Sequence, residues 1–135
     1  MTPQPLIAVR DVQASSRWYQ TLLGCSSGHG GAEYEQLVID GRMLLQLHAW
    51  EAHDHPHMGR PDVKPNGNGV LLWFQTERFE EAVQRAKKLQ AEILLGPEVN
   101  ENANHRELWI RDPDGYVVVI ASAYGDLGIR AHDEE

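Results

Sequence analysis

The segment LIAVRDVQASSRWYQTLLG, at residues 6–24, decides the fold. Its first four residues form an apolar run that predicts a buried strand, and Asp11 follows at the position of a helix N-cap. Gly24 can adopt the left-handed conformation that ends a helix. The residues between them predict a helix with one apolar stripe, formed by Trp18, Tyr19, Leu22 and Leu23.

Two further strands are expected in the first half of the chain. Residues 34–39 and 42–50 flank Asp40-Gly41, a dipeptide typical of a two-residue β-hairpin. Residues 26–31 are rich in Ser and Gly but lack the G-x-G-x-x-G spacing and the P-loop lysine. We therefore expect a flexible turn there and no phosphate site.

The second half repeats this order of elements. Residues 70–74 predict a strand, and Thr76 takes the cap position that Asp11 holds in the first half. Acidic residues lie early in the following helix and basic residues late, as the helix dipole favours. The apolar stripe of this helix consists of Phe79, Ala82, Val83, Ala86 and Leu89.

Short strands and turns complete the second half. Strands are expected at residues 92–95, 105–110 and 116–121, with a turn at 112–115. Gly96-Pro97 and the Asn-rich residues 100–104 are expected to be loops.

Two copies of a βαβββ unit predict an α+β protein with two four-stranded sheets, each with one helix on its convex side. Neither copy can bury enough apolar surface alone, so we expect the sheets to form a concave cleft that takes a small ligand. We expect one domain over residues 1–135. Its parts are module one at about 1–50, a linker at about 51–69, module two at about 70–123 and a tail at 124–135.

Composition limits the partners. The chain has 135 residues, with 12 Lys plus Arg against 20 Asp plus Glu, a formal net charge of −8. This balance argues against nucleic acid and anionic membranes, which need clustered basic residues. The lone Cys25 cannot form an internal disulfide, and no signal peptide or long apolar run is present. We expect a soluble, cytoplasmic protein.

Two motifs resemble the vicinal-oxygen-chelate superfamily, which includes glyoxalase I, bleomycin- and fosfomycin-resistance proteins and extradiol dioxygenases. The opening motif is Val9-Arg10-Asp11, Ser15 and then Trp18-Tyr19-x-x-Leu22-Leu23-Gly24, and the closing motif is Asp112-Pro113-Asp114-Gly115-Tyr116. The resemblance implies the fold of this glyoxalase/bleomycin-resistance/dioxygenase group and a homodimer. It does not select one function, because the superfamily contains both enzymes and antibiotic-sequestering proteins.

The resemblance also implies where a metal would bind. The four positions that hold ligands in metal-dependent members correspond here to Gln4, Gln46, Val70 and Val119. Valine cannot bind a cation, and neutral amides are poor ligands without an anionic partner. We therefore expect no metal at the family positions and no cofactor, which argues against glyoxalase I and ordinary extradiol chemistry.

Strand alternation predicts which side chains line the cleft. Trp73 falls in register with Leu71 on the helix side and is expected in the core. Trp50 and Trp109 fall on the cleft side, where they either stack on a planar or cationic ligand or fill the junction between modules. The residues expected to face the cleft are Gln4, Leu6, Ala8, Arg10, Leu44, Gln46, His48, Trp50, Val70, Leu72, His105, Glu107, Trp109, Arg111, Val117 and Val119.

Three hypotheses follow for function. The first is a metal-free cleft that sequesters a planar or cationic small molecule. The second is an enzyme, a lyase, isomerase or dioxygenase, in which His105 and Glu107 act as an acid–base pair with His48 opposite. The third is a divalent metal held at a new site by His48, His105 and Glu107. A role in protein interaction is the remaining alternative. We interpret His53, His55 and His57 as a His-rich polar linker, with weak metal capture as the alternative.

Overall fold

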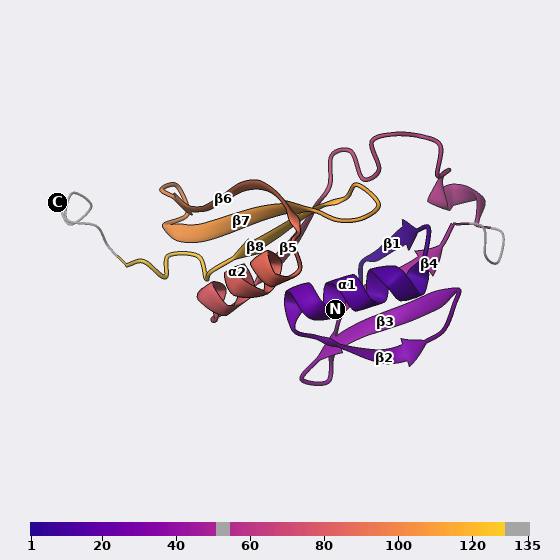
Figure 1. Cartoon of the computed structure of the whole chain (residues 1–135), viewed down its shortest axis with the longest axis horizontal. Coiled ribbons are helices and arrows are strands. Elements are labelled where there is room, and N and C mark those ends of the chain that lie inside the picture. Colours follow the sequence, from indigo (N-terminus) through magenta and orange to yellow (C-terminus); the bar gives the residue numbers. More distant parts are fainter. Residues whose placement is uncertain (51–54, 129–135) are drawn as a thin grey trace. The chain divides into compact units, whose positions relative to one another are not determined.

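The structure is a computed structural model that describes residues 1–50 and 55–128 (Figure 1). It divides into two compact units, residues 1–66 and 67–135, which are described here one at a time. The boundary lies inside the linker expected at residues 51–69. His53, one of the three linker histidines, and residues 129–135 of the expected tail lie outside the described residues.

The first unit contains one four-stranded sheet and one long helix. The sheet has the strand order β1-β4-β3-β2, in which β1 runs parallel to β4 and the other pairs are antiparallel. A short 3₁₀ helix, η1, follows in the linker at Pro56–Met58. The elements are β1 (Leu6–Val9), α1 (Val12–Leu23), β2 (Ser26–Gly30), β3 (Tyr34–Ile39) and β4 (Arg42–Ala49).

The helix and hairpin signals of the first half are confirmed. A side-chain oxygen of Asp11 accepts a hydrogen bond from the Ala14 amide at 3.0 Å, so Asp11 caps α1. Gly24 ends the helix with a φ of 68°. Asp40 and Gly41 have φ values of 50° and 75°, as a tight turn between two antiparallel strands requires.

The prediction of a flexible turn at residues 26–31 is wrong. Ser26–Gly30 forms β2, an exposed strand at the edge of the sheet that pairs with β3. Ser and Gly have low strand propensity, so this segment carries no local strand signal. Backbone pairing with β3 determines its conformation.

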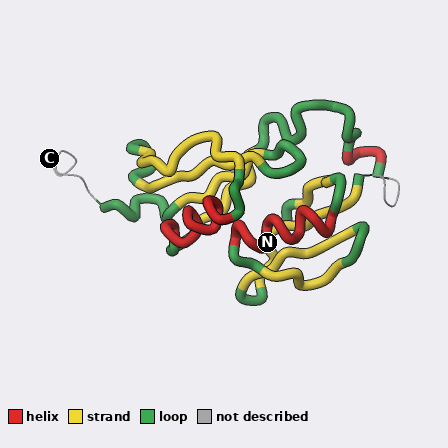
Figure 2. Tube along the Cα trace, viewed as in Figure 1, coloured by secondary structure: helices red, strands yellow, loops and turns green. Residues whose placement is uncertain are grey.

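The second unit repeats the architecture. Its sheet has the order β5-β8-β7-β6, with β5 parallel to β8 and the other pairs antiparallel. Figure 2 shows the same sequence of strand, helix and three strands in both units. The α+β class and the two tandem βαβββ modules are therefore confirmed. The elements are β5 (Leu71–Gln75), α2 (Phe79–Lys88), β6 (Glu92–Asn100), β7 (His105–Arg111) and β8 (Val117–Ala121).

Two boundaries in the second unit differ from the prediction. Thr76 does not cap α2, because its hydroxyl accepts a hydrogen bond from the Arg78 amide in the turn before the helix. The loop expected at Gly96-Pro97 lies within β6, where the pairing with β7 shifts register. Pro is tolerated on an edge strand at such an irregularity, since no ladder hydrogen bond is lost there.

The prediction of which β5 side chains face the helix is also wrong. The register pairs Trp73 with Val119 and Leu71 with Val117, so these four side chains share one face of the sheet. Leu72, which was expected on the cleft side, is buried on the other face, whereas Trp73 is 45% exposed. Because the side-chain period of a strand is two, an error of one residue exchanges the faces of the whole strand.

Arg106 identifies the face that α2 covers. Its guanidinium contacts the Glu80 carboxylate at 2.6 Å and lies 5.0 Å from the centroid of the Phe79 ring, and both of these residues belong to α2. Leu108 and Ile110, which alternate with the same period as Arg106, are buried. His105 and the residues in phase with it on β7 therefore project from the face opposite α2, as the alternation predicted.

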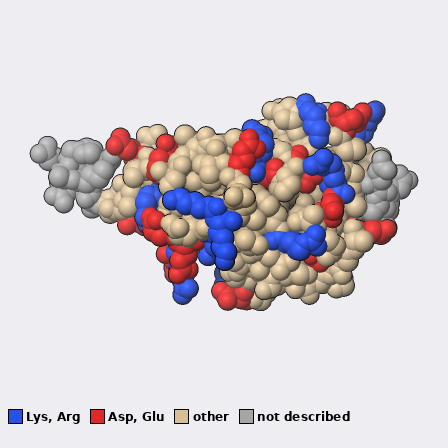
Figure 3. Space-filling model, in the orientation of Figure 1, with Lys and Arg blue, Asp and Glu red and all other residues tan. Residues whose placement is uncertain are grey.

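Charges of both signs are distributed over the two units. On the face drawn in Figure 3, Lys and Arg side chains lie among Asp and Glu side chains. In α2, Glu80 and Glu81 occupy the first turn and Arg85, Lys87 and Lys88 the last, which confirms the expected polarity. No helix within residues 1–50 and 55–128 is both long enough and apolar enough to cross a lipid bilayer.

Gly67 and Gly69, at the start of the second unit, both have positive φ, at 70° and 86°. A Cβ at position 67 would lie 2.6 Å from the ring of Tyr116, which is buried. A Cβ at position 69 would meet no atom within 4 Å. The two glycines therefore differ in packing while sharing a backbone conformation that disfavours side chains.

We predict that Gly67→Ala destabilises the protein more than Gly69→Ala does. Both variants incur backbone strain of about 1–2 kcal/mol. Gly67→Ala adds an overpacking cost of about 1–3 kcal/mol against Tyr116. Urea denaturation of the two variants measures the difference, and equal losses would show that the ring of Tyr116 does not confine this turn.

Candidate functional site

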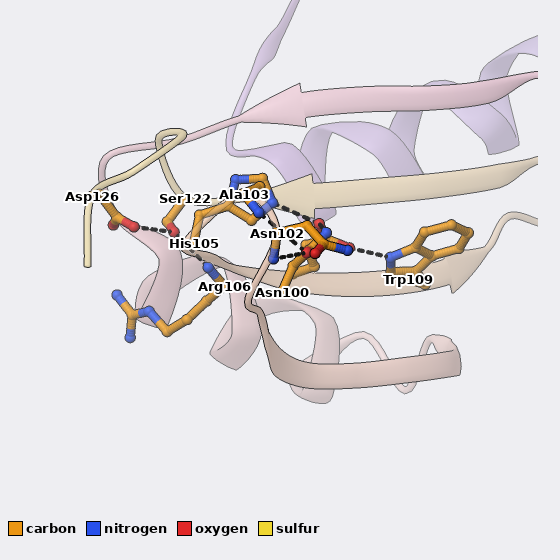
Figure 4. Close-up of polar contacts among 9 residues, drawn as sticks. Asn100, Asn102, Ala103, His105, Arg106, Trp109, Ser122 and Asp126 are labelled. Carbon is orange, nitrogen blue, oxygen red and sulfur yellow. Dashed lines mark hydrogen bonds and ion pairs between the residues drawn. The ribbon is translucent and has the colours of Figure 1, made fainter. Parts of the chain in front are cut away.

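A cluster of polar and aromatic side chains lies on the face of the second sheet opposite α2. His105, Glu107 and Trp109 project from β7, and Asn100 lies opposite His105 at the end of β6. Figure 4 shows the hydrogen bonds that join them. We call these four residues the β7 cluster.

Glu107 is the centre of the β7 cluster. Its Oε2 atom accepts hydrogen bonds from His105 Nε2 at 2.6 Å and from Asn100 Nδ2 at 2.7 Å. Its Oε1 atom accepts one from Trp109 Nε1 at 2.9 Å. The side chains of His105 and Glu107 are each only 5% exposed. The predicted acid–base pair is therefore in direct contact.

The environment of Glu107 favours its charged form. Burial alone would raise the pKa of this carboxyl, but the hydrogen bonds from Trp109, His105 and Asn100, with a smaller coulombic contribution from His105, outweigh that effect and lower its pKa below the ordinary value of 4.5. Glu107 is consequently a carboxylate at neutral pH, with acceptor capacity only.

The two ring nitrogens of His105 differ in their surroundings. Nε2 faces Glu107, whereas Nδ1 is buried and has no hydrogen-bond partner among the described residues. The ring centroid of His105 lies 6.0 Å from that of Trp73 and 6.4 Å from that of Tyr124. Two exposed aromatic side chains thus flank a buried imidazole.

Asn100 is positioned by the turn that joins β6 to β7. Its Oδ1 atom accepts hydrogen bonds from the amides of Asn102 and Ala103, at 3.0 and 3.3 Å. This leaves Nδ2 directed at Glu107. The sequence prediction missed Asn100, because an Asn in an Asn-rich turn has an ordinary local explanation.

Apolar side chains are exposed around the β7 cluster. Leu71 and Trp73 on β5 and Leu95 on β6 are 43, 45 and 44% exposed. The strand registers place all three on the face of Trp109, since Leu95 pairs with Trp109 and Trp73 with Val119, which also pairs with Trp109. Within the second unit, this face combines exposed apolar surface with a buried charged group.

The first unit has its own polar row. Tyr34 donates a hydrogen bond to Gln46 Oε1 and accepts one from Gln36 Nε2. Gln46 Nε2 donates to the carbonyl of Gln4 at 2.9 Å. His48 is buried, its Nδ1 lies 2.7 Å from the Ala49 carbonyl, and its ring contacts those of Tyr34 and His55.

The other predicted ligand-binding residues occupy varied positions. Arg10 is exposed after β1, and Trp50 is half-buried after β4. Val70 is exposed just before β5, Arg111 is half-buried and donates to the Gly115 carbonyl, and Val119 is fully buried. Because His48 belongs to the first unit and His105 and Glu107 to the second, the structure describes the predicted trio in two separate parts.

Comparison with known proteins places the whole architecture in one family. A family model described as Glyoxalase/Bleomycin resistance protein/Dioxygenase superfamily matches residues 3–120. The chain belongs to this superfamily. The resemblance inferred from the opening and closing motifs is therefore confirmed.

Solved structures share the fold at low sequence identity. A glyoxalase/bleomycin resistance protein/dioxygenase family enzyme from Burkholderia phytofirmans PsJN is 19% identical, with a TM-score of 0.72 over 89% of this chain and 96% of that one. A virulence protein from Salmonella typhimurium is 20% identical, with a TM-score of 0.67 over 91% and 96%. TioX from Micromonospora sp. ML1 is 13% identical, with a TM-score of 0.67 over 90% and 98%. Each likeness concerns the fold alone.

The residues at the positions that the resemblance assigns to metal ligands do not fit a divalent cation. Val70 and Val119 have no donor atom, and Val119 is fully buried. Both ends of the Gln46 amide are already hydrogen-bonded, to Tyr34 and to the Gln4 carbonyl. Within residues 1–50 and 55–128, no group of three or more His, Cys, Asp or Glu side chains is arranged to hold a metal ion. The binding of a ligand, a homodimer and a cytoplasmic location stay predictions.

We predict that Glu107→Gln lowers the free energy of unfolding by about 3 kcal/mol at pH 7. A Gln side chain offers one acceptor oxygen to three donors and adds a competing amide. The lowered pKa of Glu107 means that its charged form stabilises the folded state above pH 4.5, and that this contribution is lost as the pH falls through the folded-state value.

The gap in stability between wild type and Glu107→Gln should therefore narrow below about pH 4.5. Urea titrations at pH 7, at pH 4.5 and at about one pH unit below 4.5 measure this gap. Glu98→Gln is the matched control, because Glu98 pairs with Glu107 in the ladder but is exposed. A gap that stays constant with pH would contradict the ionised state of Glu107.

Proposed function

We propose that this superfamily member binds a small planar molecule on the face of its second sheet opposite α2, without a metal ion, and sequesters it as resistance proteins do. The observation that carries the proposal is the exposed indole of Trp73 beside the buried His105, with Leu71 and Leu95 on the same face. Exposed apolar groups gathered around a few polar atoms are typical of ligand sites.

A planar ligand suits this face better than a cationic one. The negative charge of Glu107 is buried and already satisfied by three donors, so it offers little to an external cation. Trp109 is held edge-on to Glu107 through its indole N–H. The exposed ring of Trp73, in contrast, can stack on an aromatic ligand.

An acid–base enzyme is the second candidate. The 2.6 Å contact between His105 Nε2 and Glu107 Oε2 favours it, because a carboxylate that orients an imidazole is a common arrangement for proton transfer. The two candidates differ in what happens to the bound molecule. A binding protein returns it unchanged, whereas an enzyme releases a product of different mass or structure.

We predict that Trp73→Ala weakens the binding of 2-methoxynaphthalene, a planar probe, by about 5- to 30-fold. This range corresponds to about 1–2 kcal/mol for a lost aromatic contact. Isothermal titration calorimetry measures the affinity. Trp18→Ala is the control, since it removes a half-buried indole from α1 in the first unit.

Equal affinities in wild type and Trp73→Ala would contradict the assignment of the site to this face. Mass spectrometry and NMR of the probe recovered after incubation separate the two candidates. Conversion that is lost in Glu107→Gln would favour the enzyme.

Metal independence has its own test. We predict that EDTA leaves the melting temperature and the probe affinity of the purified protein unchanged, because the superfamily's metal positions lack suitable donor atoms. A metal that bound the native state at a hundred times its dissociation constant would stabilise it by about 2.7 kcal/mol. A fall in melting temperature on EDTA treatment, reversed by adding Zn²⁺ or Fe²⁺, would overturn this part of the proposal.

A further inference from the structure

We propose that Nδ1 of His105 accepts a hydrogen bond from the bound molecule, so that the site selects planar aromatic ligands that carry an O–H or N–H donor. This inference rests on the proposed function and adds the chemical class of the ligand. It depends on three features: the fixed orientation of His105, the unused nitrogen atom and the exposed rings beside it.

The β7 cluster determines which nitrogen of His105 carries the proton. Glu107 is held as a carboxylate by Asn100 and Trp109 as well as by His105, so it can only accept. The short contact with His105 therefore requires a proton on Nε2. In the neutral imidazole, Nδ1 then has a free lone pair.

The alternative, a protonated Nδ1, is disfavoured by its surroundings. Nδ1 is buried without a partner among the described residues, and a buried cationic N–H with no acceptor is costlier than an unused lone pair. Asn100 and Trp109 also supply two of the three hydrogen bonds of Glu107, so the carboxylate does not depend on a charged imidazole alone. We therefore assign Nδ1 as an acceptor.

The aromatic side chains provide both a route to Nδ1 and a surface for the ligand. The rings of Trp73 and Tyr124 flank His105, and Tyr124 is 77% exposed. The backbone after Tyr124 is fixed by the hydrogen bond from the Gly125 amide to the Ala103 carbonyl. Because Tyr124 is so exposed, rotation of its side chain away from the His105 ring costs little buried surface, and a ligand would approach His105 on this side.

Burial of Nδ1 explains why the site would discriminate between ligands with and without a hydrogen-bond donor. A buried acceptor that meets a ligand donor gains a partner, whereas a ligand without a donor leaves it unsatisfied. Sites built to hydrogen-bond a hydroxyl reject analogues that lack it more strongly than apolar pockets reject a change in size. The expected preference for a donor is at least about tenfold.

The experiment compares three probes of similar shape on the full chain: 2-naphthol, 2-methoxynaphthalene and naphthalene. Calorimetry should show 2-naphthol binding at least about tenfold more tightly than the other two. His105→Phe should abolish this preference. His105→Gln should retain part of it, because its amide can donate to Glu107 and present an oxygen. His29→Phe, on the exposed strand β2, is the control and should behave as wild type.

Nitrogen-15 NMR of labelled wild-type protein tests the same contact without a variant. Before binding, the spectrum of His105 should show a protonated Nε2 and an unprotonated Nδ1. The addition of 2-naphthol should shift the Nδ1 resonance, and 2-methoxynaphthalene should not. This measurement keeps the inference testable if His105→Phe fails to fold.

The outcomes separate the inference from the proposed function. Equal binding of all three probes, with loss in Trp73→Ala, overturns the role of His105 and leaves the planar-ligand site intact. A fourth probe, 2-naphthoate, offers only acceptors at neutral pH. Binding of 2-naphthoate more tightly than 2-naphthol, or a protonated Nδ1 before binding, also overturns it. The absence of binding by every probe overturns the proposed function and the inference together.

Discussion

The buried carboxylate of Glu107 is the constraint on which the second unit depends. A charge in the interior is tolerated only where hydrogen bonds replace water, and Glu107 receives them from the imidazole, amide and indole of three different residues. Those hydrogen bonds in turn determine the orientation of His105 and Trp109 and tie the end of β6 to β7. The same residues therefore serve the stability of the hairpin and the chemistry of its surface.

The two units share one architecture but carry different side chains on their sheets. In the first unit, hydrogen bonds join Gln46, Tyr34 and Gln36 in a neutral row. In the second, an anion sits beneath exposed aromatic and aliphatic side chains. In each unit one helix packs on the sheet, and the two sheets carry different polar side chains. Because a fold does not fix a function, the few side chains on that face decide the chemistry of each unit.

The sequence predicted much of the fold because its strongest signals are local. Asp11, Gly24 and Asp40-Gly41 specify a cap, a stop and a turn through their own backbone preferences. The predicted element boundaries failed for β2, for β6 beyond Leu95 and for the start of α2. In the two strands, pairing with a neighbouring strand overrides weak local propensity, and a sequence pattern contains no information about that neighbour.

The sequence by itself determined the class of the fold, the family and the alternation that places His105, Glu107 and Trp109 on one face of β7. Its resemblance to the superfamily assigns valines to two of the positions that hold metal ligands in metal-dependent members, and this assignment stays a prediction. Only the tertiary structure decided that Trp73 faces His105, because the register between β5 and β8 sets which face each residue of β5 occupies. It likewise decided that Asn100 completes the shell around Glu107, since that contact joins two strands across a turn. Local preference can specify a turn or an alternation, but a contact between strands exists only once both have paired.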